Sequence, residues 1–103
     1  MATQFEIWLN YTQAMRQADR LEDQAGRLEE IGRNRVASVL QELAGAWQGD
    51  NSEAFRSRAF RLQTEIRDVA SILKRVAAVI RQTARNTYDA EMKALELAQK
   101  RTY

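Results

Sequence analysis

The 103-residue sequence contains no cysteine, no histidine and no proline, and it has only four glycines. Without cysteine or histidine the chain has no disulfide, no thiol nucleophile, no imidazole base and no zinc site of the usual ligand types. The four glycines form no phosphate-binding loop, nucleophile elbow or calcium-binding loop. We therefore expect no enzyme activity, no metal site and no cofactor.

Long apolar runs are absent as well. No run approaches the length that spans a bilayer, so we expect no membrane insertion. The first residues, MATQFEIWLNY, lack the basic segment and the apolar core of a cleavable signal peptide. Any export is therefore expected to use another signal.

Apolar residues make up 45% of the chain and recur every three or four positions, which is typical of α-helix. A first apolar seam contains Ile7, Tyr11, Ala14, Ala18, Leu21, Ala25, Leu28, Gly32, Val36, Val39, Leu43 and Trp47. A second contains Phe55, Ala59, Leu62, Ile66, Val69, Leu73, Val76 and Ile80, and weakens through Thr83, Thr87, Ala90, Ala94 and Leu97. These seams predict an all-α fold with helices at about 4–46 and 52–98, a frayed C-terminal tail and a single domain over 1–103.

Residues 47–51 form the predicted turn between the helices. Gly49 can adopt the left-handed conformation that ends a helix, and Asp50, Asn51 and Ser52 are good N-caps. We expect an antiparallel helix-turn-helix hairpin in which residues whose numbers sum to about 97 or 98 come level. This register brings opposite charges together in three pairs, Glu42 with Arg56, Glu30 with Arg67, and Asp23 with Arg75. Ordinary solvated faces explain the same charges equally well.

The apolar surface of each predicted helix is wider than one neighbouring helix can cover. Ile72 and Val79 lie off the seam on one flank of the second helix, and Trp8 and Met15 share a flank of the first. Such flanks are either partly exposed apolar residues or a face that buries against a second hairpin. We predict the latter, a dimer that forms a four-helix bundle.

The two halves of the chain differ in charge. Residues 1–50 contain 5 basic and 8 acidic residues, and residues 51–103 contain 11 basic and 6 acidic residues. The basic second helix could contact a phosphate backbone or an acidic protein, and its candidate ladder is Arg56, Arg58, Arg61, Arg81 and Arg85. Because acids are interleaved with these bases and no nucleic-acid motif accompanies them, we expect a protein partner and no nucleic acid.

The tripeptide Trp47-Gln48-Gly49 lies near the middle of the chain, and Ser52-Glu53-Ala54-Phe55 follows it. Together with the chain length, these residues resemble the WXG family, the early-secreted-antigen-like substrates of type VII secretion. The resemblance implies a helical hairpin secreted by a Gram-positive or actinobacterial cell. It also implies a role in virulence or interbacterial competition, as an effector or as the escort of a larger toxin. The implied partners are a second copy, a related WXG protein or the toxin, and the type VII secretion ATPase.

The resemblance further implies that Trp47 and Gly49 belong to an export signal. Family members commonly have a C-terminal motif in which an acidic residue follows a tyrosine after three intervening residues. This motif is similar to the second part of a bipartite export signal. Here Glu91 follows Tyr88 by three positions, and Met92 occupies the fourth. Tyr88 is thus either part of a displaced signal or an interfacial aromatic. A basic nucleic-acid-binding protein and a coiled-coil adaptor are the alternative functions.

Overall fold

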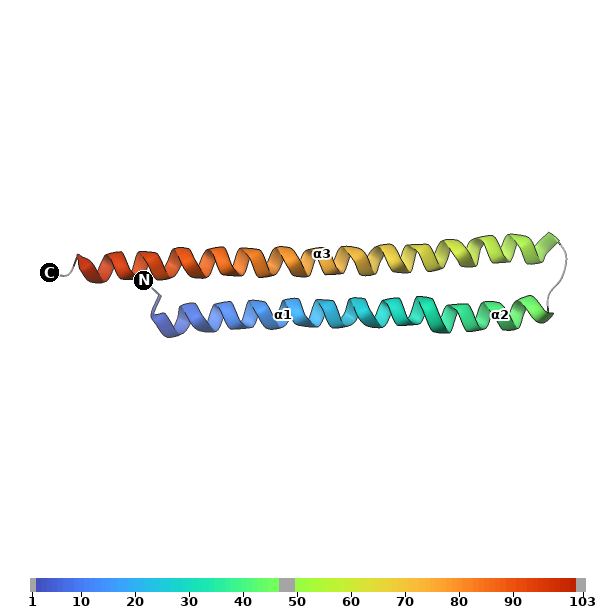
Figure 1. Ribbon diagram of the computed structural model, residues 1–103, viewed down its shortest axis with the longest axis horizontal. Helices are drawn as coiled ribbons and strands as arrows, with labels where there is room; N and C mark the ends of the chain where they lie inside the picture. The colour runs from blue at the N-terminus through green and yellow to red at the C-terminus, as the bar shows by residue number, and fades with distance from the viewer. Residues whose placement is uncertain (1, 47–49, 102–103) are drawn as a thin grey trace. The chain divides into compact units, whose positions relative to one another are not determined.

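The computed structural model describes residues 2–46 and 50–101, and of Asp50 and Asn51 it describes the backbone only. The first arm of the chain consists of helix α1 (Gln4–Glu30), the π-helix η1 (Ile31–Val36) and helix α2 (Ala37–Ala46). Helix α3 (Asp50–Lys100) forms the second arm (Figure 1). No strand occurs in the ranges described. The predicted all-α helical hairpin is therefore confirmed.

The ends of these helices follow from local hydrogen bonds. The side-chain oxygen of Thr3 accepts a hydrogen bond of 3.1 Å from the backbone N–H of Glu6, which caps the start of α1. Helix α3 begins two residues before the predicted start and continues to Lys100, where the N–H of Arg101 bonds to the carbonyls of Leu97 and Ala98. Trp47, Gln48 and Gly49, the centre of the predicted turn, lie outside the described residues.

The chain divides into two compact units, each a pair of antiparallel helical segments, while the predicted single domain stays a prediction. Unit 1 comprises residues 1–21 and 75–103, and unit 2 comprises residues 22–74. In unit 2, Gly32 lies opposite Ile66, and their numbers sum to 98, as the predicted register requires. In unit 1, the rings of Tyr11 and Tyr88 lie 5.0 Å apart, one position from that register.

The interior of each unit is built mainly from small residues. Unit 1 buries Ile7, Ala18, Ala77 and Ala84. Unit 2 buries Ala25, Gly32, Ser52, Ala59 and Ala70. Small side chains at seven-residue spacing let two helices approach closely, and at Gly32 an added Cβ would lie only 3.1 Å from Cγ2 of Ile66. The close approach therefore depends on side chains that are short or absent.

Eight of the thirteen predicted seam positions of α3 are wrong by one residue. Val69 was placed inside but is 48% exposed, whereas Ala70 is fully buried. Val69 follows Ile66 by three residues and Ala70 follows it by four, and both spacings keep a residue on the same helix face. The closely spaced helix backbones accept the smaller side chain, that of Ala70. The same shift puts Gln63, Ala77, Ala84, Tyr88, Glu91, Leu95 and Ala98 inside in place of Leu62, Val76, Thr83, Thr87, Ala90, Ala94 and Leu97.

The first arm departs from the predicted seam at η1. Val39 was expected inside but is 53% exposed, while its neighbour Leu40 is half-buried. A π-helix holds more residues in each turn than an α-helix, so the residues that follow it present a different face. The sequence pattern gave no sign of this interruption, because apolar residues occur at both positions.

Small interior residues leave the large ones outside. In the described part of the chain no large side chain is fully buried, and twelve large hydrophobic residues are at least 36% exposed. Fully burying one such side chain stabilises a protein by about 1.5–3 kcal/mol relative to its exposed state. The hairpin alone therefore uses little of its apolar surface.

We expect Ala70→Leu to destabilise the protein by about 1–3 kcal/mol, because the added carbons must separate two closely packed helices. Ala78→Leu, the same substitution at an exposed position of α3, is the matched control and should change the stability by no more than about 0.5 kcal/mol. Urea unfolding followed by circular dichroism, at one protein concentration, measures both. Equal effects of the two substitutions would contradict the assignment of the seam.

Candidate functional site

The sequence-predicted site residues fall into three groups in the structure. Trp47 and Gly49 lie outside the described residues, so their part in an export signal stays a prediction. Of the predicted dimer residues, Ile72 is 49% exposed and Val79 is 64% exposed. The remaining four predicted site residues belong to unit 1. Trp8 is exposed, and Met15, Tyr88 and Glu91 are half-buried.

An open groove of about 320 Å³ in unit 1 brings Val79, Tyr88 and Glu91 together. Its other walls are mainly apolar and include Ile7, Ala14 and Ile80 from α1 and α3, with Tyr11 beside Tyr88. The two tyrosine rings are tilted by 47° at a centroid distance of 5.0 Å, a favourable arrangement for aromatic pairs. Tyr88 thus has a packing role within the hairpin.

Trp8 lies beside the same aromatic pair on another face of unit 1. It lines a second groove with Tyr11, Arg85, Tyr88 and Asp89. Its ring is 6.2 Å from that of Phe5, and both side chains are exposed. Tyr11 therefore links both grooves, although the sequence had placed it only on a seam. The numbers of Tyr11 and Tyr88 sum to 99, one more than the upper value of the predicted register. This near-match could have revealed their contact.

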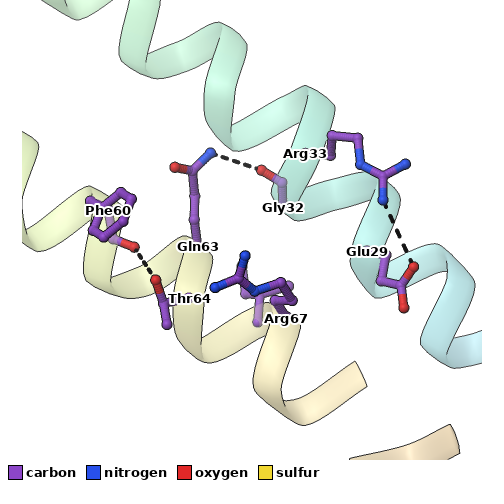
Figure 2. Close-up of a pocket in the computed structure, with 8 residues that line it drawn as sticks. Glu29, Gly32, Arg33, Phe60, Gln63, Thr64 and Arg67 are labelled. Atoms are coloured by element: carbon purple, nitrogen blue, oxygen red, sulfur yellow. Dashed lines mark hydrogen bonds and ion pairs between the residues drawn. The ribbon is translucent and has the colours of Figure 1, made fainter. Parts of the chain in front are cut away.

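Unit 2 carries an open groove of about 380 Å³ where η1 faces α3. Figure 2 shows Gln63 reaching from α3 to the backbone of Gly32, where its Nε2 donates a hydrogen bond of 3.0 Å to the carbonyl. The groove is also lined by Glu29, Arg33, Phe60, Thr64, Ile66 and Arg67. Sequence reasoning did not identify Gln63, because a polar residue was not expected on the inner face of α3.

Ion pairs join the acidic first arm to the basic second arm within each unit. In unit 2, Lys74 Nζ lies 2.5 Å from Glu29 Oε1, and in unit 1, Arg81 Nη2 lies 2.7 Å from Asp19 Oδ1. Glu30 was predicted to pair with Arg67. Its neighbour Glu29 pairs with Lys74 across unit 2. Opposite charges do meet between the arms, in a register a few positions from the one predicted.

The hydrogen bond from Lys74 is the main cause that lowers the pKa of the Glu29 carboxyl. Partial burial acts against it, and the positive charges of Lys74 and Arg33 lower the pKa further. A carboxyl whose pKa is lower in the folded state stabilises that state above its unfolded pKa. This contribution is lost as the pH falls through the folded pKa.

The chemistry of these grooves suits protein contact. The walls of the 320 Å³ groove in unit 1 are mainly aliphatic and aromatic, whereas the groove in unit 2 combines Phe60 and Ile66 with charged and polar side chains. Over residues 2–46 and 50–101, no group of three or more acidic side chains could hold a metal ion. In the same ranges, no helix combines the length and apolar character needed to cross a membrane.

Comparison with known proteins gives one match. The model of the family WXG100, described as proteins of 100 residues with WXG, matches residues 6–92. No curated protein matches the sequence. No solved structure matches it either.

We expect Lys74→Met to raise the pKa of Glu29 toward its ordinary value, because the hydrogen bond and the nearest positive charge are both removed. The variant should then lose less folding stability than the parent protein as the pH falls through the range of the lowered Glu29 pKa. Carbon-detected NMR titration of the Glu29 carboxyl measures the shift. Lys100→Met, which removes the partner of Glu96, is the control and should leave Glu29 unchanged. An unchanged Glu29 titration in Lys74→Met would contradict the assigned cause.

Proposed function

Because the chain belongs to the WXG100 family, we propose that it is exported by a type VII secretion system and acts as a homodimer. Members of this family are small, non-enzymatic secreted substrates of type VII systems, and they typically form dimers. The proposal for this chain concerns its partner, its interface and its export signal. One observation carries it: the hairpin interior uses small residues, and the large apolar residues face outward.

The outward residues of α3 follow helical spacing in both units. Leu62, Val69 and Ile72 are exposed in unit 2, and Val76 and Val79 are exposed in unit 1. Steps of seven, three, four and three residues place apolar side chains along one helix face. Monomeric proteins seldom expose large apolar patches, so a partner that covers the exposed residues of each unit is expected. A second hairpin would complete a four-helix bundle.

Charge supports a second copy as that partner. The first arm is acidic and α3 is basic, and within each unit the two are already joined by an ion pair. A second copy presents the same two surfaces, so an antiparallel arrangement brings the acidic arm of each copy to the basic arm of the other. A related WXG protein or a larger toxin would have to carry matching acidic and basic surfaces of its own.

The biological role follows from the partner. As a homodimer the protein acts itself as a secreted effector of a Gram-positive bacterium, in virulence or in competition between bacteria. If instead a larger toxin binds the apolar face, the protein is the escort that brings the toxin to the secretion ATPase. Export in either role uses a signal other than a cleavable signal peptide. Trp47 and Gly49 form its first part, and Tyr88 with Glu91 is the candidate for the second.

Ile72→Glu together with Val79→Glu should convert the dimer to monomers of lower helix content, because two charges would have to enter an apolar interface. Sedimentation at micromolar concentration measures the mass, and circular dichroism measures the helicity. Ser71→Glu with Gln82→Glu, at exposed positions of the same helix, is the matched control and should remain dimeric. A monomeric parent protein would rule out the homodimer, and recovery of a stable complex with a related WXG protein would then identify a heterodimer.

Trp47→Ala should leave a folded, assembled protein and abolish its export, because the sequence predicts Trp47 in the turn and the family resemblance makes it part of the export signal. Gln48→Ala, at the variable position of the motif, is the control and should be exported normally. Tyr88→Ala should reduce export less and lower the melting temperature, because Tyr11 loses its ring partner. Immunoblots of medium and cell pellet, with melting of the purified variants, separate the two effects. Parental export of Trp47→Ala would show that the motif is no export signal here.

A further inference from the structure

The first arm contains one more residue between interior positions than an α-helix provides. Ala25 and Gly32 are buried and seven residues apart, but the next equivalent position is Leu40, which is half-buried and comes eight residues after Gly32. Val36 and Ala37, between them, are half-buried as well. Val39, at the seventh position, is 53% exposed. The extra residue falls at η1, a π-helix, the helix type defined by hydrogen bonds between residues five positions apart. One added residue rotates the face of α2 by roughly 100°.

The side chain of Gln63 meets this interruption directly. A backbone carbonyl only accepts hydrogen bonds, so the amide nitrogen of Gln63 must face it, and Nε2 lies 3.0 Å from the oxygen of Gly32 (Figure 2). Gly32 is the second residue of η1, and its lack of a Cβ lets the backbone lie against Ile66. At the other end of η1, the N–H of Ala37 bonds to the carbonyl of Asn34, which closes the π-helix with a tighter turn.

Burial at positions 39 and 40 distinguishes only weakly between two arrangements of this arm. One contains the π-helix, which we call the π register, and the other is an uninterrupted α-helix. With the π-helix, Leu40 lies inside and Val39 outside. An uninterrupted α-helix would place Val39 inside and Leu40 outside, and at this pair of positions the buried side chains differ by one methylene. A single hydrogen bond is comparable in strength to this difference, so it can decide which register is populated.

We propose that Gln63 selects the π register, and that unit 2 has a second state in which residues 22–46 form a continuous α-helix with Val39 inside. Gln63 is therefore a positioning residue for α2. A partner that contacts Val39 from outside would favour the π register, because only that register exposes it. This device is independent of the proposed export, since it concerns the helix pair of unit 2 alone.

The lack of cysteine allows each register to be read from thiol chemistry. Val39→Cys and Leu40→Cys, made singly in the full chain, report on the two positions through their rates of alkylation by iodoacetamide. In the π register the thiol of Val39→Cys is expected to react faster. Leu73→Cys, at a half-buried position of α3 in the same unit, reports on general loosening of the helix pair.

Adding Gln63→Leu to each reporter should raise the ratio of the Leu40→Cys rate to the Val39→Cys rate by about 2- to 10-fold. This is the population change that loss of one hydrogen bond produces in a two-state equilibrium. Gln82→Leu is the matched control, because Gln82 bonds to Asn86 within its own helix at 3.1 Å, and it should leave the ratio unchanged. If Gln63→Leu lowers helix content, Gln63→Met, with an unbranched side chain of similar length, takes its place.

Two results would overturn the proposal. An unchanged rate ratio in a folded Gln63 variant would show that Gln63 does not select the register. A parallel rise in all three reporters, including Leu73→Cys, would show that its loss merely loosens the helix pair. Neither result depends on secretion, so the proposed function is tested separately by the export and dimer measurements.

Discussion

The close approach of two helices through small side chains is the constraint on which the rest of this structure depends. Ala25, Gly32 and Ala70 in unit 2, and Ala18 and Ala77 in unit 1, occupy the interior. Ala70 and Ala77 do so where the larger Val69 and Val76 were expected. Packing at this distance leaves no room for the branched side chains of Leu62, Val69 and Val76 of α3. Those side chains are therefore directed outward, and the apolar surface available for a partner is a direct consequence of the interior. The dimer proposal rests on this displacement as much as on the family.

The sequence was sufficient for the fold class, because apolar spacing of three and four residues over most of the chain admits only helices. It was insufficient for the face of α3, because Val69 and Ala70 both satisfy that spacing, and hydrophobicity favoured the larger residue. Side-chain size decides between them only when the distance between two backbones is known. The π-helix was missed for a related reason: Val39 and Leu40 are both aliphatic, so the pattern contained no gap where an extra residue would be noticed.

The candidate site was predictable in its residue types and less so in its contacts. The outward positions of Ile72 and Val79 were predictable because both residues lie off the predicted seam of α3, a property of spacing alone. Their part in a dimer stays a prediction. The contact of Tyr11 with Tyr88 needed the register of the hairpin to within one residue, and the bond from Gln63 to Gly32 needed a polar residue on an inner face. The ion pair of Glu29 with Lys74 shows the limit of a register deduced from charge, since adjacent acids at 29 and 30 offer alternative partners.

The separation of interior and exterior on α3 has an evolutionary consequence. The buried positions include the alanines at 70, 77 and 84, whereas the exposed face proposed for recognition includes their neighbours 69, 72, 76 and 79. Substitutions in the second set can change which protein is bound without altering how the two helices meet. A gene duplication could in this way turn a self-pairing chain into two chains that prefer each other, while each copy retains the same hairpin.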